Sequence, residues 1–316
     1  GKVKTTDTDG PTGFNNSVTG QGNLKAVNYP SSTVLASTWD YMTAYEVGVA
    51  IGTEGAALGI SGWYGPGANL HRSPLGGRNF EYYSEDPLLS GIMCAYHVMG
   101  AKSKGVTAYI KHITVNETES GRNGAYKWLT EQNLRENLLK PFEYAVKVGG
   151  SNGMMSSVDR VGSTRAASSY AMLTQVLRNE WGFRGTVITD YYQNAGASRA
   201  SDTVHDVDEC VRAGNSQILY TDGGIGWFNE TESATSQQAI FKSAKDILYA
   251  YVDTLNYSMT AQGLEREDIT LTSSEVFPWW IFLLIGIDVV GVGLAGLWVA
   301  LAARGYVKSR KEKITA

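Results

Sequence analysis

An uninterrupted apolar segment near the C-terminus constrains this chain more than any other feature. Residues 279–303 read WWIFLLIGIDVVGVGLAGLWVALAA, 25 residues with one charged side chain, Asp288. About 20 apolar residues in a helix cross the hydrocarbon core of a bilayer, so the segment is long enough to span it with some tilt. A buried core helix is the alternative, but the length and the basic flank on one side only favour a membrane span. We therefore expect a lipid bilayer as a partner through residues 279–303.

Charge is distributed unevenly on the two sides of this segment. The 316-residue chain carries 27 basic and 31 acidic side chains, a net charge of −4, which implies no polyanion-binding surface and no nucleic-acid partner. Residues 276–316 hold five basic and two acidic residues, which leaves residues 1–275 with a net charge of −7. By the positive-inside rule the basic flank places the C-terminus in the cytoplasm. The expectation is a single-pass protein of the cell membrane whose catalytic part is extracellular.

The sequence divides into four segments on this interpretation. They are a folded domain over 1–258, a linker over 259–275, a transmembrane helix over 276–303 and a basic cytoplasmic tail over 304–316. No signal peptide begins the chain, so for an outward-facing protein we expect a C-terminal fragment of a longer one. The two cysteines, Cys94 and Cys210, exclude a disulfide framework and a four-thiolate zinc site. No cluster has metal-ligand spacing, and we expect no metal and no cofactor.

Short apolar runs alternate with helical periodicity along the folded domain. The predicted strands are 105–110, 153–157, 186–190 and 217–220, and the predicted helices are 130–139, 170–181, 205–213 and 236–255. This alternation favours a parallel sheet with helices outside it. Polar residues such as Lys111, His112 and Asp190 follow strands, which is where the active sites of (β/α)8 barrels lie. We therefore predict an α/β fold, a (β/α)8 TIM-like barrel incomplete at its N-terminus, followed by the transmembrane helix.

Several ordered motifs in this domain resemble those of glycoside hydrolase family 3. The matching segments are 9–13 (DGPTG), 29–40 (YPSSTVLASTWD), 65–87 (GPGANLHRSPLGGRNFEYYSEDP), 109–112 (YIKH), 116–119 (NETE), 138–143 (LLKPFE) and 181–190 (WGFRGTVITD). The resemblance runs from about residue 9 to residue 255. It implies a retaining, exo-acting β-glycosidase, most like a β-glucosidase, that hydrolyses terminal non-reducing β-linked sugars of an oligosaccharide or β-glucoside.

By this resemblance Asp190 is identified as the catalytic nucleophile, which forms a glycosyl-enzyme intermediate. An aspartate that caps a helix after a strand is the structural alternative. Thr189 and Tyr191 flank it where the family usually has serine and tryptophan, and Val158 stands where a tyrosine is usual after the Met-Ser-Ser segment. Arg72 resembles a family arginine that braces Asp190 or its loop.

The resemblance assigns substrate binding to Asp9, Arg78, Lys111 and His112, the last two as hydrogen-bond donors to sugar hydroxyls. Lys111 and His112 are adjacent, so on an extended strand they would point in opposite directions. A bend or a cis peptide is needed for both to reach one sugar. The structural alternatives are a salt bridge from Arg78 to Glu81 or Glu85 and a core position for His112; His97 is expected to be a surface or core histidine.

The general acid is missing from the matched motifs. A retaining enzyme needs a second carboxyl group roughly 5–5.5 Å from the nucleophile. The β-glucosidase-like branch takes a glutamate from a separate sandwich domain, and we expect that domain upstream, in a member with reversed domain order. Glu119, which matches a family glutamate near the sugar, is the less favoured candidate for a partial substitute. The alternatives are a catalytically incomplete, membrane-anchored sugar-binding module and, among enzymes, a β-xylosidase.

Overall fold

The computed structural model describes residues 4–15, 26–119, 122, 126–191, 207–219, 230–255 and 279–315. The predicted linker over 259–275, His205, and Tyr220 at the end of a predicted strand lie outside the described residues. The chain divides into two compact units, Gly1–Leu271 and Thr272–Ala316. The first unit contains all five predicted site residues.

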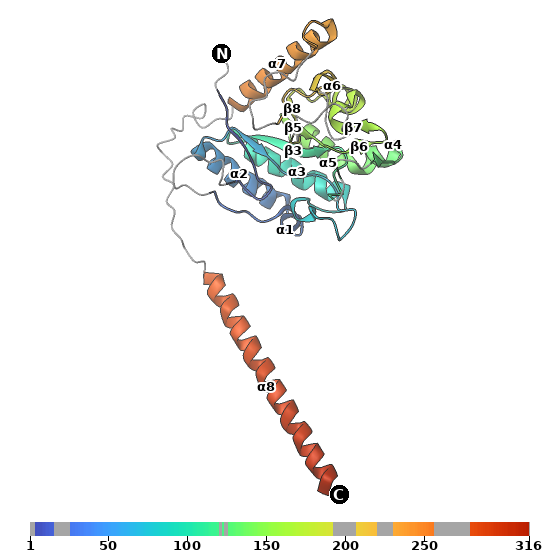
Figure 1. Cartoon of the computed structure of the whole chain (residues 1–316). Helices are drawn as coiled ribbons and strands as arrows, with labels where there is room; N and C mark the ends of the chain where they lie inside the picture. Colours follow the sequence, from blue (N-terminus) through green and yellow to red (C-terminus); the bar gives the residue numbers. More distant parts are fainter. Residues whose placement is uncertain are drawn as a thin grey trace. The chain divides into compact units, whose positions relative to one another are not determined.

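A parallel sheet forms the centre of the first unit (Figure 1). Its strands, in spatial order, are β1 (Asp7–Asp9), β2 (Gly62–Tyr64), β3 (Thr107–Ile113), β5 (Gly153–Ser156) and β8 (Thr186–Thr189). Every adjacent pair is parallel, and the spatial order follows the chain order. The sheet is therefore half of a barrel.

Side chains alternate between the two faces of this half-barrel, as the period of a strand requires. Ile110, Met154 and Val187 belong to the main core, which also contains residues of the surrounding helices. Their neighbours Tyr109 and Ile188 belong to a separate small cluster on the other face. The strand interiors are apolar on both sides, which is typical of parallel sheets and explains why these segments could be predicted.

Helices cover one face of the sheet, with α2, α3 and α5 below it in Figure 1. The helices of this unit are α1 (Ser32–Ala36), α2 (Tyr41–Leu58), α3 (Pro87–Lys102), α4 (Glu131–Asn133), α5 (Lys140–Lys147), α6 (Val207–Ala213) and α7 (Ala234–Leu255). The 3-10 turns are η1 (Asn79–Glu81) and η3 (Ala166–Ser168), and the helices with π-type hydrogen bonding are η2 (Leu134–Leu138) and η4 (Ala171–Glu180).

Capping residues and glycines determine where α2 and α3 begin and how closely they pack. Asp40 and Asp86 cap α2 and α3, because each side chain accepts a hydrogen bond from a backbone N–H of the first turn. The helices pack closely at Gly48 and Gly100. A Cβ atom on Gly48 would lie 2.1 Å from the carbonyl oxygen of His97, and one on Gly100 would lie 2.2 Å from that of Tyr45. Glycine is therefore required at both positions.

Helix α7 packs at the end of the sheet where the strands begin. The hydroxyl oxygens of Thr254 and Thr107 are 2.6 Å apart, and the Asn152 amide, just before β5, donates to Thr254 Oγ1 at 3.0 Å. The Asp253 carboxylate lies 2.7 Å from Lys102 Nζ. These contacts close the amino-terminal ends of the strands and leave their carboxyl ends for the functional residues.

Most predicted elements are confirmed with shifted ends, and two predictions need correction. The helix predicted over 130–139 is divided among α4, η2 and α5, although Leu134, Leu138 and Leu139 are buried on one side as expected. The strand predicted at 217–220 is reduced, among the described residues, to a single bridge between Gln217 and Ile188. The predicted barrel fold is confirmed in part, because the principal sheet of the described residues is a five-stranded parallel half-barrel.

A second, small sheet lies beside the first. It consists of β4 (Tyr126–Lys127), β6 (Arg160–Val161) and β7 (Thr164–Arg165), with β4 parallel and β7 antiparallel to β6. The second unit contains α8 (Trp279–Thr315). Within α8, Ile281–Tyr306 is long and apolar enough to cross a membrane by length and composition.

Candidate active site

The structure brings the five predicted site residues together at the carboxyl ends of the strands. Asp9 ends β1, Lys111 and His112 lie in β3, Asp190 directly follows β8, and Arg78 precedes η1. Because parallel strands all end at the same edge of the sheet, residues far apart in sequence meet there. A chain of short contacts connects all five.

Lys111 and Arg78 share one buried carboxylate, that of Glu81. Arg78 Nε forms a salt bridge with Glu81 Oε1, and Lys111 Nζ lies 3.9 Å from Glu81 Oε2. Lys111 Nζ also donates to Asp9 Oδ1 at 2.7 Å. The Lys111 and Glu81 side chains are each 4% exposed, whereas Asp9 is 60% exposed. Asp9 therefore forms the open rim of the cluster, and Glu81 forms its floor.

Lys111 and His112 both direct their side chains into this cluster although they are adjacent in the chain. The peptide bond between them is cis, which is one of the two conformations that the sequence required. Asn69 holds the backbone here: its Oδ1 accepts from His112 N at 2.8 Å, and its Nδ2 donates to the carbonyl oxygens of His112 and Thr114 at 3.1 and 3.0 Å. The backbone turn is thus fixed by a buried amide.

His112 is a neutral imidazole between cations. Its side chain is 1% exposed, and Arg78 Nη2 lies 3.2 Å from its Nε2. Burial, and then the positive charges of Arg78, Lys111 and Arg122, hold its pKa well below the usual value. The expected alternative of a core histidine is therefore half right, since the ring is buried but its Nε2 reaches the cluster. His97 does occupy the core, and burial lowers its pKa to about 3.

Asp190 has one carboxylate oxygen anchored and the other directed at the cluster. Oδ1 accepts from Tyr191 N at 2.7 Å, while Oδ2 lies 3.6 Å from His112 Nε2 and 3.7 Å from Arg122 Nη1. Among the described residues Oδ2 has no hydrogen-bond partner. Burial raises the pKa of Asp190, and Arg122, the Tyr191 N–H and the other nearby cations oppose that rise.

Three residues at the site were not predicted in their observed roles. The sequence suggested Glu81 only as a salt-bridge partner of Arg78. The structure shows that Arg78 forms this salt bridge and also lies in the site. Arg122 contacts Asp190, whereas Arg72 is exposed and has no ion pair with Asp190 among the described residues; the segment after Tyr191, which Arg72 was also expected to brace, lies outside them. Glu119 Oε2 lies 3.7 Å from Arg78 Nη1 and 3.4 Å from Arg122 Nη1. The Arg122 segment lacks apolar periodicity, so only three-dimensional proximity reveals its position.

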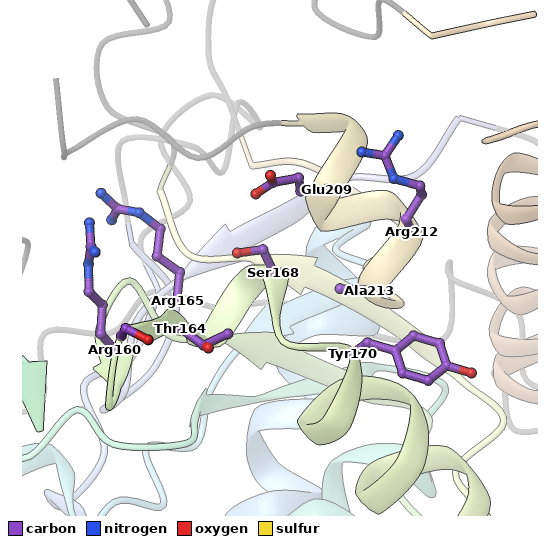
Figure 2. Close-up of a pocket in the computed structure, with 9 residues that line it drawn as sticks. Arg160, Thr164, Arg165, Ser168, Tyr170, Glu209, Arg212 and Ala213 are labelled. Atoms are coloured by element: carbon purple, nitrogen blue, oxygen red, sulfur yellow. The ribbon is translucent and has the colours of Figure 1, made fainter. Parts of the chain in front are cut away.

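An arginine-lined cavity of about 520 Å³ lies apart from these residues (Figure 2). Arg160 and Arg165 come from the small sheet, and Glu209 and Arg212 come from α6. Arg212 is paired with Glu230. The described residues that line it include none of the five predicted site residues, so we do not assign the catalytic site to it.

The cluster at the strand ends has the chemistry of a site for a polyhydroxylated ligand. A carboxylate with one open oxygen can attack an electrophilic carbon, and Lys111, Arg78 and Asp9 offer donors and acceptors to hydroxyl groups. Among the described residues no three His, Cys, Asp or Glu side chains are grouped to hold a metal ion.

The chain matches the glycosyl hydrolase family 3 N-terminal domain over residues 14–235, which is most of its length. The chain belongs to glycosyl hydrolase family 3. Arg78, Lys111, His112 and Asp190 lie inside the matched region, and Asp9 precedes it.

Similar proteins of this family carry β-glucosidase names. β-Glucosidase A from Butyrivibrio fibrisolvens is 41% identical over 184 residues, 58% of this chain and 22% of that protein. A β-glucosidase from Ruminococcus albus is 34% identical over 251 residues, 78% of this chain and 26% of that protein. β-Glucosidase 3B from Thermotoga neapolitana, solved in complex with glucose, is 33% identical with a TM-score of 0.67, covering 79% of this chain and 36% of that one. The chain thus spans about a quarter of the length of these two curated family 3 relatives.

Proposed function

We propose that this chain is the barrel part of a retaining, exo-acting β-glycosidase, most like a β-glucosidase, that acts through a glycosyl-Asp190 intermediate. The observation that carries the proposal is the environment of Asp190. The carboxylate follows β8, one oxygen is anchored by the Tyr191 N–H, and the other is directed at His112 and Arg122. A nucleophile must present one oxygen to the anomeric carbon while the rest of the group is held still. The glucosidase names of the relatives support the substrate class.

The terminal sugar would be held by the other four predicted residues. Asp9, at the exposed rim, accepts from hydroxyl groups, while Lys111, Arg78 and His112 contact hydroxyls deeper in the site. Such a set suits glucose, and xylose differs from glucose only by the absence of the hydroxymethyl group. A β-xylosidase is therefore the nearest variant within the enzyme class.

The general acid, in this proposal, is a glutamate of a sandwich domain that precedes the barrel. Glu119 is the candidate within this chain, but its carboxylate is engaged by the guanidinium groups of Arg78 and Arg122. In a protein with this reversed domain order, the glutamate would complete the acid–nucleophile pair with Asp190.

Membrane anchoring through α8 completes the proposed protein. Ile281–Tyr306 has the length and composition of a span, and basic residues follow it. With the basic tail in the cytoplasm, the active site would be outside the cell, where oligosaccharides are met. A sugar-binding module without catalysis is less favoured, because the similar curated proteins carry enzyme names.

The stereochemistry of hydrolysis tests the proposal. Full-length protein incubated with an aryl β-glucoside should first release β-glucose, observed by proton NMR before mutarotation. Asp190→Asn should release no sugar. Asp253→Asn, at the opposite end of the strands, is the matched control and should behave as the wild type. Initial release of α-glucose, or unchanged hydrolysis by Asp190→Asn, would contradict the assignment.

A further inference from the structure

A buried ion pair, Lys127 with Asp159, lies next to the site residues. Lys127 Nζ is 2.8 Å from Asp159 Oδ2 and donates to the carbonyl oxygen of Val115 at 2.7 Å. The Asp159 side chain is fully buried and that of Lys127 is 9% exposed. Removing two charges from water costs more than a well-packed apolar pair would, so the pair is not explained by stability alone.

Asn116 connects this pair to the site. Its side-chain amide lies between the Asp159 carboxylate on one side and Arg78 and His112 on the other. The amide nitrogen can only donate and the amide oxygen can only accept, so the nitrogen must face Asp159 Oδ2, at 2.9 Å. The oxygen then accepts from Arg78 Nη1 at 3.0 Å and faces His112 Nδ1 at 3.1 Å. The negative charge of Asp159 and the Arg78 N–H together determine which end of the amide meets the histidine.

A neutral imidazole carries one proton, and its two nitrogens need opposite partners. His112 Nδ1 faces the Asn116 oxygen, an acceptor, and Nε2 faces Arg78 Nη2, a donor, at 3.2 Å. Both contacts are hydrogen bonds only when the proton is on Nδ1. With the proton on Nε2, that N–H would meet the Arg78 N–H, and the bare Nδ1 would meet the amide oxygen.

We propose that Asp159 is a positioning residue that, through Asn116, holds His112 as the Nδ1–H tautomer, so that Nε2 enters the site as a hydrogen-bond acceptor. This role rests on the proposed function of the site and revises it at one atom. The family resemblance implied that His112 donates to a sugar hydroxyl, whereas in this tautomer Nε2 can only accept a hydrogen bond, as it does from Arg78 Nη2. In this tautomer the His112 Nε2 atom near Asp190 Oδ2 carries a lone pair and no proton. The ring therefore donates no hydrogen bond to that carboxylate oxygen.

The groups around Asp159 are consistent with an ionised carboxylate near neutral pH. Burial raises its pKa to about 6, and the hydrogen bond and charge of Lys127, the Ser157 hydroxyl and the charge of Arg122 oppose that rise. Above that pH the carboxylate accepts from Asn116. Below it, the protonated acid can donate to the Asn116 oxygen instead, and the constraint on the tautomer weakens.

Nitrogen NMR of the full chain in detergent micelles, with ¹⁵N-labelled histidine, measures the tautomer directly. The chain has four histidines, and His112→Gln identifies the relevant ring by the loss of its signals. At pH 7.5 the wild type should show Nδ1 protonated and Nε2 bare. Asp159→Asn should lower the population protonated at Nδ1, because an amide at 159 can also donate to the Asn116 oxygen and let the nitrogen of Asn116 turn toward the ring, while Arg78 still opposes a proton on Nε2. Lys127→Met/Asp159→Asn should do the same without leaving a buried lysine unpaired.

A charge exchange provides the rescue. In Asn116→Asp/Asp159→Asn the new carboxylate faces Nδ1 and accepts from it whichever way it turns, so the Nδ1–H tautomer should return. The ring of His97, buried at 2.8 Å from the Tyr83 hydroxyl, reports in every variant that the domain is folded.

Two results would overturn the proposal. One is a bare Nδ1 in the wild type, and the other is a wild-type tautomer that persists in both folded Asp159 variants. The wild-type spectrum needs no variant at Asp159 and decides the first result even if the variants do not fold. Because the tautomer is read without turnover, its outcome is independent of whether the full-length protein hydrolyses a glycoside.

Discussion

Two groups of ion pairs in this domain use the same residue types and have opposite environments. On the surface, Arg135 lies 2.6 Å from Glu180 and 2.8 Å from Glu131, and these side chains are 40%, 46% and 77% exposed. At the strand ends, Glu81 and Lys111 are each 4% exposed. The surface geometry is at least as good as that of the site. The two groups therefore differ in solvent access and not in the quality of their contacts.

This difference explains which group can do chemistry. On the surface, hydrogen bonds to Arg135 lower the pKa of Glu180, so the carboxylate simply stays ionised. In the site, burial acts first and raises the pKa of Asp190 against the pull of the neighbouring cations. In the buried site, therefore, the pKa of a carboxylate depends on burial as well as on the neighbouring charges. Four predictions test this contrast between the buried and the exposed groups, in order of decreasing effect.

The largest effect is expected at the proposed nucleophile. Asp190→Asn keeps the shape of the side chain but removes the attacking charge, so kcat for an aryl β-glucoside should fall by a factor on the order of 10⁴ or more. The measurement is initial rate with full-length protein. Activity within tenfold of the wild type would show that Asp190 does not form the covalent bond.

The next effect is on stability, at the carboxylate shared by two cations. Glu81→Gln leaves Arg78 and Lys111 without their buried counter-charge, and the free energy of unfolding should fall by about 3 kcal/mol. Urea titration followed by tryptophan fluorescence measures it. Glu180→Gln is the matched surface control, and equal losses in the two variants would remove the contrast between the regions.

A smaller effect should appear in the pH profile. Asp190 attacks only when ionised, so the rate falls as the pH drops through its raised pKa. Arg122 lowers that pKa, so Arg122→Gln should move the acid limb of the kcat/KM profile to higher pH. Arg72→Gln, on an exposed arginine without a contact to Asp190 among the described residues, should leave the limb in place. If the acid limb does not move in Arg122→Gln, Arg122 does not lower the pKa of Asp190.

The smallest effect belongs to the surface group. Arg135→Gln should change the free energy of unfolding by about 1 kcal/mol or less and leave activity unchanged, because water screens exposed pairs. The same urea titration measures it. A loss as large as that of Glu81→Gln would mean that exposure does not separate the two regions.

The sequence predicted the residues that adjoin strands better than those that lie in loops. Asp9, Lys111, His112 and Asp190 lie in, end or follow apolar strands, so their meeting point follows from parallel pairing. Arg122 follows no such element and is found only through its 3.7 Å contact with Asp190.

Pairing partners were harder to predict than positions. Asp159 and Lys127 are 32 positions apart in sequence, and nothing in either segment indicates that they share a hydrogen bond. The strand predicted at 217–220 failed for a related reason, since an apolar run becomes a strand only where a neighbour extends the ladder. Among the described residues of this segment, a single bridge to Ile188 is formed.

The most direct test of the central claim is to trap and map the covalent intermediate. Full-length protein is incubated with 2,4-dinitrophenyl 2-deoxy-2-fluoro-β-glucoside, whose leaving group needs little protonation, and the intact mass and peptide masses are then measured. The account predicts one added fluorosugar, on the peptide that contains Asp190. An adduct on another carboxylate, or turnover of the β-glucoside without any adduct, would contradict it.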